Sequence, residues 1–202
     1  MADVFTRLLD KGIAENILPA KTQEARNWFR EQAESTSIRN PKTVINSSPI
    51  QTARTITGFL YLFQYQPKMI DELPYHDRFP VVFPFRRVRN GFYGINMHYL
   101  PYAYRAILMD NLYDLAVDEE YDEETRLRLT YSILQSAGKF RFFKPCVRHY
   151  LNNHVRSRFA LIPSGQWDIA LFLPLERFVA PNGSAVSAQR VHRNSVQKIR
   201  RG

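Results

Sequence analysis

The segment from residue 58 to residue 99 restricts the fold more than any other part of the chain. Gly58–Gln66 (GFLYLFQYQ) and Arg78–Arg89 (RFPVVFPFRRVR) are rich in aromatic and β-branched residues, which favour strands. Two prolines place the second strand at a sheet edge or across a bulge. Asn90-Gly91 predicts a tight hairpin, because both residues tolerate positive φ, and Phe92–Tyr99 is the returning strand. The sequence therefore predicts an antiparallel sheet of about three strands.

Four segments have the apolar spacing of amphipathic helices. They are residues 3–15, 22–34, 101–116 and 122–137. Pro101 suits the first position of the third helix. Asp122 can cap the fourth, because its carboxylate can accept hydrogen bonds from the free amides of the first turn. With the predicted sheet, these helices indicate an α+β protein.

A fifth helix is predicted over Pro145–Arg156. Val147, Leu151 and Val155 recur every four residues and would face inward. The polar and cationic residues between them would face outward. A short strand, Phe159–Ile162, is predicted to follow.

We expect three regions along the chain. Residues 1–57 hold two helices and a polar extended arm over 35–55, residues 58–178 form the α+β core, and residues 179–202 form a basic tail. The tail has no Asp or Glu and shows no helical periodicity, so we expect it to become ordered only on a partner. The predicted fold is a small antiparallel sheet packed by helices, with two N-terminal helices and an extended basic C-terminal tail.

The composition indicates an acidic partner. The 202 residues carry 28 Lys and Arg against 19 Asp and Glu, a net charge of +9, which favours nucleic acid first and a membrane surface second. No apolar run approaches the roughly 20 residues that span a bilayer, and the N-terminus lacks the pattern of a signal peptide. The one cysteine, Cys146, excludes an intramolecular disulfide. We expect a protein found inside a cell, or in a particle assembled there, with no membrane partner.

The charges are sorted into two blocks. Residues 126–158 hold eight Lys and Arg and no Asp or Glu, whereas residues 110–124 hold eight Asp and Glu and no Lys or Arg. Segregated charge creates a field at the surface instead of cancelling locally. Aromatic residues such as Phe142 and Tyr150 lie among the cations, as they do on nucleic-acid-binding surfaces. A solvated basic face with no ligand is the simpler alternative.

The sequence contains no recognisable catalytic pattern. Its few glycines form no phosphate-binding loop, and His149 and His154 are too far apart in register to share a helix face as metal ligands. Cys146 near His149 could suggest a thiol nucleophile, but a buried structural cysteine is commoner. A nuclease needs paired carboxylates to hold a divalent metal, and a solvated loop explains the acidic block more simply. We expect no enzyme activity, no cofactor and no metal site.

The remaining function is binding to DNA phosphates. Such contacts give strong, salt-sensitive affinity that does not depend on base sequence, and no helix-turn-helix or zinc finger indicates base readout. The predicted contacts lie in the basic block and in the tail. They are Lys139, Arg141, Lys144, Arg148, Arg156, Arg158, Arg193, Lys198, Arg200 and Arg201.

Four motifs carry a family resemblance. They are Leu73–Pro80 (LPYHDRFP), Gly91–Leu100 (GFYGINMHYL), Phe143–Leu151 (FKPCVRHYL) and Trp167–Pro174 (WDIALFLP). Together they make residues 58–178 similar to the DNA end protector, or head-completion, proteins of T4-like tailed bacteriophages. The motifs are as apolar and aromatic as they are basic, so they define a fold more than a site.

This resemblance implies a non-catalytic virion protein that binds the end of the packaged double-stranded genome. It implies protection of that end from host exonuclease, and location in the virion and, during assembly, in the host cytoplasm. It also implies portal, neck or other virion proteins as partners and leaves oligomerisation open.

Two other functions remain open. A structural subunit of the phage neck, tail or baseplate would use extended termini for assembly, and weak DNA affinity would distinguish it from an end protector. An RNA-binding protein would expose aromatic residues on one sheet face. However, residues 59–65 and 79–85 are apolar on both alternating faces, which indicates a covered sheet.

Overall fold

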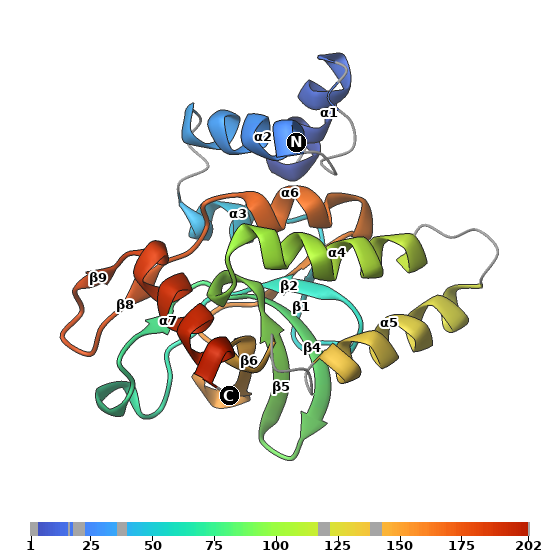
Figure 1. Cartoon of the computed structure of the whole chain (residues 1–202). Helices are drawn as coiled ribbons and strands as arrows, with labels where there is room; N and C mark the ends of the chain where they lie inside the picture. The colour runs from blue at the N-terminus through green and yellow to red at the C-terminus, as the bar shows by residue number, and fades with distance from the viewer. Residues whose placement is uncertain are drawn as a thin grey trace.

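A computed structural model describes residues 4–15, 17, 23–35, 40–116, 122–137 and 143–201, and Figure 1 shows their arrangement. The α-helices are α1 Val4–Ala14, α2 Gln23–Ser35, α3 Pro41–Ser47, α4 Tyr102–Ala116, α5 Glu123–Ala137, α6 Trp167–Phe172 and α7 Ala188–Arg201. The strands are β1 Gln51–Thr52, β2 Leu60–Leu62, β3 His76–Asp77, β4 Val81–Val88, β5 Gly91–Asn96, β6 Val147–Leu151, β7 Phe159–Ile162, β8 Phe178–Val179 and β9 Ala185–Val186. Short 3₁₀ turns include η2 Ile70–Glu72, η3 Met97–Tyr99 and η4 Lys144–Cys146.

The strands form two antiparallel sheets, which confirms the α+β class but enlarges the predicted sheet. The main sheet has six strands in the order β1-β7-β2-β4-β5-β6, and a second has the order β3-β8-β9. The three predicted strands are β2, β4 and β5. The other main-sheet strands come from segments far away along the chain, whose pairing the local pattern does not specify.

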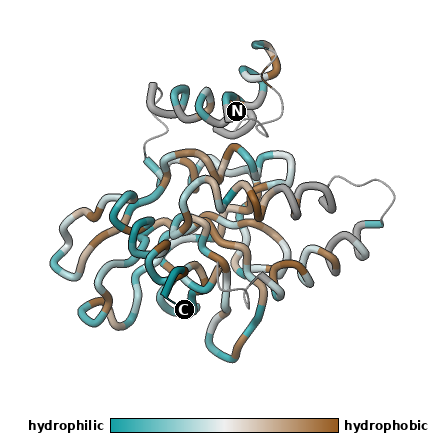
Figure 2. The backbone as a smooth tube through the Cα atoms, in the orientation of Figure 1, coloured by the Kyte–Doolittle hydropathy of each residue, from teal (hydrophilic) through white to brown (hydrophobic). Residues whose placement is uncertain are grey.

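Both faces of the main sheet are buried at β2 and along the first five residues of β4, as the apolar runs at 59–65 and 79–85 predicted. Leu60, Val81 and Phe83 belong to the larger core, which also includes residues of α4 and α6. Tyr61 and Phe63 point to the opposite face and belong to a smaller, mainly aromatic cluster. Figure 2 shows the hydrophobic residues gathered toward this centre and α7 largely hydrophilic.

The four predicted helices are confirmed as α1, α2, α4 and α5. The α1 and α2 helices contact α6 and lie above it in Figure 1. The carboxylate of Asp122 accepts a hydrogen bond from the Thr125 amide at 2.7 Å, which is the predicted cap of α5. Within the predicted arm, residues 41–47 form α3, in which Val44 and Ile45 are buried. The domain boundaries after residues 57 and 178 remain predictions.

The predicted helix over Pro145–Arg156 is wrong. The segment forms η4 and then β6, which pairs with β5 from Ile95 opposite Val147 to Gly91 opposite Leu151. A spacing of four residues puts side chains on one face in a strand as well as in a helix, because four is an even number. The pattern of Val147 and Leu151 therefore could not distinguish the two structures.

The hairpin between β4 and β5 is shifted by one residue from its predicted position. Val88 pairs with Gly91, so Arg89 and Asn90 form the turn and Gly91 belongs to the strand. The φ of Gly91 lies outside the left-handed region. Its lack of a side chain matters instead because β6 approaches closely: a Cβ there would lie 1.9 Å from the carbonyl oxygen of Tyr150.

The predicted extended tail is also wrong, because residues 188–201 form the helix α7. Val191, Ser195 and Ile199 are buried at intervals of four residues. This stripe is easily missed since one of its three members is a serine. In the part of the chain that the structure describes, no helix combines the length and hydropathy of a membrane span.

Candidate nucleic-acid interface

The helix α7 presents a cationic face to solvent. Because Val191, Ser195 and Ile199 pack against the core, the opposite side of the helix faces solvent, and the helix contains no Asp or Glu. Its five cations are exposed: Arg190, Arg193, Lys198, Arg200 and Arg201. An acid-free, exposed cationic helix is suited to a polyanion, because no carboxylate on the helix competes for the cations.

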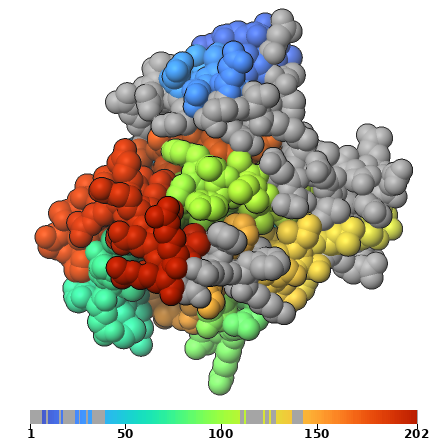
Figure 3. All heavy atoms as spheres, in the orientation of Figure 1, coloured from blue at the N-terminus to red at the C-terminus, as the bar shows by residue number. Residues whose placement is uncertain are grey.

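Contacts with the core fix the position of α7. The helix packs against η3 and η4. His192 Nε2 lies 3.0 Å from the His98 carbonyl oxygen, and Asn194 Nδ2 lies 3.4 Å from the Tyr75 hydroxyl. Figure 3 shows α7 (red) on the surface beside the teal segment around residues 67–74. The cations of α7 are therefore held on the folded core.

A buried ion pair supports this junction. Arg105 of α4 is fully buried and pairs with the carboxylate of Glu176. It also donates through Nε to the Leu100 carbonyl at 2.9 Å and through Nη2 to the His98 carbonyl at 3.3 Å. Burial alone would raise the pKa of Glu176, but Arg105 holds it below its usual value. Arg105 thereby ties α4 to the turn against which α7 packs.

The edge strand β6 lies next to α7 and carries Arg148. This side chain is partly buried, and its Cζ lies 4.0 Å from the centre of the Tyr99 ring, a cation–π contact. Its Nη1 donates to the Val147 carbonyl at 3.2 Å. Lys144, in η4, is exposed on the same side of the fold as α7.

A row of stacked planar groups lies on the other face of this edge. Arg86, Tyr93 and His149 are cross-strand neighbours on β4, β5 and β6. The Arg86 Cζ lies 4.5 Å from the Tyr93 ring centre, and the rings of Tyr93 and His149 stack at 4.7 Å with an interplanar angle of 16°. Arg86 and His149 are exposed, so the row is accessible.

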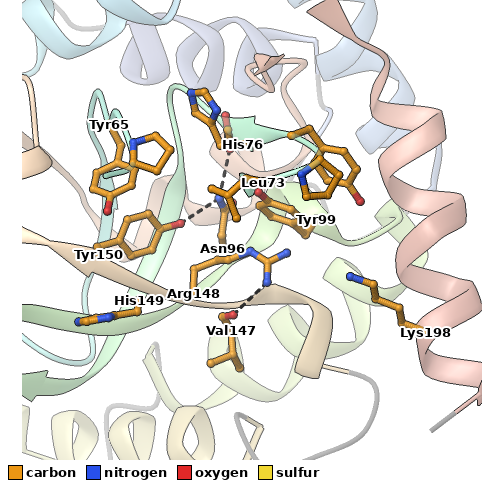
Figure 4. A pocket seen from close by; sticks show the side chains of 14 residues that line it. Tyr65, Leu73, His76, Asn96, Tyr99, Val147, Arg148, His149, Tyr150 and Lys198 are labelled. Atoms are coloured by element: carbon orange, nitrogen blue, oxygen red, sulfur yellow. Dashed lines mark hydrogen bonds between the residues drawn. The ribbon is translucent and has the colours of Figure 1, made fainter. Parts of the chain in front are cut away.

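A cavity of about 390 Å³ opens between β6 and α7 (Figure 4). Four tyrosines contribute to its wall, together with two cations and two histidines. The tyrosines are Tyr65, Tyr75, Tyr99 and Tyr150, the cations are Arg148 and Lys198, and the histidines are His76 and His149. Lys198 extends from α7 toward Arg148.

A buried polar network supports the cavity. Asp77 Oδ2 lies 2.7 Å from His98 Nδ1 and accepts from Asn96 Nδ2 at 3.2 Å. Asn96 Nδ2 also donates to the Tyr150 hydroxyl at 3.1 Å. Burial alone would raise the pKa of Asp77, but His98 and the hydrogen-bond donors lower it on balance. Burial raises the pKa of Tyr99 to about 12, so this ring is neutral at physiological pH.

The structure brings only some of the predicted DNA contacts together. Lys144, Arg148, Arg193, Lys198, Arg200 and Arg201 lie on β6, η4 and α7. Arg158 donates to the Gln51 carbonyl of β1 at 3.3 Å, at the opposite sheet edge from β6, and Arg156 donates to the Gln66 side chain at 3.3 Å. Lys139 and Arg141 lie outside the described residues. The outward helical position predicted for Arg148 is wrong, because Arg148 lies on a strand against Tyr99.

Sequence reasoning noticed Tyr150 among the cations but did not predict Tyr65, Tyr75, Tyr99 or Arg190 as site residues. The alternation of Arg148, His149 and Tyr150 was the available signal, since it has the period of a strand. No local sequence pattern indicates that Tyr75 or Lys198 lies near Arg148 and Tyr150, because these residues come together only in the folded chain. Among the described residues, no group of three or more His, Cys, Asp or Glu side chains could hold a metal ion.

An α+β core with a cationic helix beside an aromatic, basic edge defines a class of protein suited to polyanion binding. Comparison with known proteins identifies the family. The family described as phage T4 terminal DNA protecting protein matches residues 1–195, and this chain belongs to it. The match extends well beyond residues 58–178, and it confirms the resemblance. No curated protein and no solved structure matches the chain.

The family assignment sets the function. The chain is a phage protein that protects the terminal DNA of the genome, and its family is not one of enzymes. This confirms the expected non-catalytic, DNA-end-protecting role.

Proposed function

We propose that the exposed cations of α7, together with Lys144 and the β6 edge, form the surface that holds the DNA end. The observation that carries this proposal is the acid-free face of α7 fixed against the core. Phosphates of a duplex terminus would lie along this face, and the affinity would be salt-sensitive and independent of sequence. Arg156, Arg158, Lys139 and Arg141 would be additional contacts.

A protein bound over the DNA end in this way would block attack by the host's exonuclease. It would act from the virion. A portal or neck protein would hold it there, through a surface other than the cationic one. The alternative, a structural neck, tail or baseplate subunit assembled through extended termini, has less support at the C-terminus, because residues 188–201 form a packed helix.

The test is binding to one duplex in two forms, linear and closed into a circle, over a series of salt concentrations. We expect tight, salt-sensitive binding to the linear form and much weaker binding to the circle. Equal, weak binding to both forms that disappears near physiological salt would contradict end binding and favour the structural alternative.

A further inference from the structure

The cavity between β6 and α7 holds a cation that no described carboxylate neutralises. Arg148 is partly buried, and its partners are the Val147 carbonyl and Tyr99. A guanidinium carries five N–H donors, so several remain for an incoming group. Asp77 is the one carboxylate in the cavity wall. It is already engaged by His98, Asn96 and the backbone amide of Phe79.

The second cation reaches the cavity from α7. Lys198 is exposed on the helix and contributes to the wall, and Figure 4 shows it directed toward Arg148. Taking a cation out of water is costly unless an anion joins it. A phosphate bound between Arg148 and Lys198 would supply that anion.

The remaining wall suits a nucleobase. The tyrosine rings are held rigidly: Tyr150 stacks on Phe92 at 5.3 Å, and the Tyr65 hydroxyl accepts from the Leu151 amide at 3.2 Å. A flat, polar-edged ring would contact this aromatic wall.

The size of the cavity limits the ligand to about one nucleotide. A volume of about 390 Å³ lies within the range of small-molecule sites and is far too small for a duplex. An internal nucleotide would have to flip out of the helix to enter, with loss of pairing and of stacking on both sides. The last nucleotide of a strand loses stacking on one side only.

We propose that this cavity takes the terminal nucleotide of one DNA strand, unpaired from its partner, while the duplex behind it lies along α7. The inference rests on the proposed function and deepens it, because it explains how the surface distinguishes an end from internal duplex. The phosphate lies between Arg148 and Lys198, and the base lies against the tyrosines.

The test measures the dissociation constant of the whole protein for four linear duplexes of one length. One has matched blunt ends, one a mismatch at the terminal pair, one the same mismatch at the centre, and one has ends closed by hairpin loops. A terminal mismatch removes the cost of unpairing, so we expect about tenfold tighter binding. The central mismatch should change nothing, and the closed ends should bind much more weakly than the matched ends.

Two tryptophan variants test whether the preference for a terminal mismatch arises in the cavity. Leu73 is 36% exposed and contributes to the cavity wall, so Leu73→Trp fills the cavity without a change in charge. Met69 is 53% exposed and is not part of that wall, so Met69→Trp is the matched control. Leu73→Trp should abolish the preference for the terminal mismatch and keep salt-sensitive duplex binding. Met69→Trp should behave as the unmodified protein.

The outcomes separate the two proposals. If linear DNA is still preferred to circular DNA but matched, mismatched and closed ends bind equally, the cavity is not the end-recognition site and the surface proposal stands. If linear and circular DNA bind equally, the proposed function fails as well. Free deoxyadenosine monophosphate is the other source of the same chemistry. If it binds at micromolar concentration without DNA, the cavity serves a free nucleotide and the assignment to DNA ends is overturned.

Discussion

At the scale of single residues, Gly91 lies in β5 with the carbonyl of Tyr150 directly against its α-carbon. A Cβ would lie 1.9 Å from that oxygen and 3.1 Å from the Leu151 Cα, so β6 would have to move. We expect Gly91→Ala to lower the free energy of unfolding by about 3 kcal/mol, the size of other overpacking effects. Urea denaturation at pH 7 measures the change.

The matched control is Gly165, where an added Cβ meets no atom within 4 Å. Gly165→Ala should change stability by less than about 0.5 kcal/mol. Similar losses for the two variants would mean that the close approach of β6 to β5 is not what requires glycine at position 91.

His192 makes stability depend on pH. Burial, followed by the positive charge of Arg105, lowers its pKa from 6.5 to about 4 in the folded protein. Between these values the unfolded chain binds a proton that the folded chain does not, so stability falls as pH decreases from about 6.5 to about 4. The pKa values of Asp77 and Glu176 are also lowered in the folded protein. Their ionised forms stabilise the fold, and this stabilisation is lost at more acidic pH, as the pH falls through the folded-state pKa of each carboxyl group.

We expect His192→Gln to reduce this dependence. Glutamine does not titrate and can still donate to the His98 carbonyl that His192 now contacts at 3.0 Å. The decrease in Tm between pH 7 and pH 5 should be smaller by about 5 °C than in the unmodified protein. His154→Gln, on a partly exposed side chain beside the Gln66 carbonyl, should keep the original pH dependence. An unchanged dependence in His192→Gln would refute the role of His192.

At the scale of elements, α7 carries the proposed contact with DNA phosphates. We expect the double variant Arg193→Gln, Arg201→Gln to weaken DNA binding uniformly across sequences. The slope of log K against log salt should fall by about 2, because each phosphate contact contributes about 1. Glutamine favours helices, so α7 should remain folded.

The control removes the same charge elsewhere. Arg7 of α1 and Lys42 of α3 are exposed on elements that do not contribute to the β6 edge. Arg7→Gln with Lys42→Gln should leave the slope at its original value. Equal slopes for the two double variants would show that net charge, and not the α7 surface, determines affinity.

The sequence predicted elements well where local spacing or composition was unambiguous. The helices α1, α2, α4 and α5 were predicted from helical spacing, and the strands β2, β4 and β5 from their aromatic and β-branched residues and the turn between β4 and β5. All of these elements are confirmed, as is β7. The β6 strand was mistaken for a helix because Val147 and Leu151 satisfy both periods, and its pairing with β5 decides the outcome. The α7 helix was missed because Ser195 interrupts its apolar stripe.

The candidate site was less predictable than the fold. The sequence identified Arg148 of β6 and four of the five cations of α7, since charge is visible in the residues themselves. It could not identify the cavity, whose wall combines Tyr65, Tyr75, Tyr99 and Tyr150 with Lys198. Folding of the core brings the tyrosines together in pairs, Tyr65 with Tyr150 and Tyr75 with Tyr99, and the packing of α7 against η3 and η4 adds Lys198.

For the whole molecule, the net charge of +9 favours binding to DNA in general. The position of the cations determines whether the protein prefers a DNA end to internal duplex. The exposed cations of α7 lie next to a cavity that admits about one nucleotide. A protein that covers an end in this way needs no catalytic group, because occupying the terminus is enough to exclude an exonuclease. The exposed cations of α7 and the adjoining cavity thus give the family's role in protecting terminal DNA a defined surface.

The most direct test is the rate at which a double-strand exonuclease degrades an end-labelled linear duplex. With the unmodified protein at saturation we expect the ends to survive. With the Arg193→Gln, Arg201→Gln variant at the same concentration we expect degradation near the rate of naked DNA, and recovery of protection at low salt. The Arg7→Gln, Lys42→Gln control should protect fully. Full protection by both double variants would contradict a protective surface on α7.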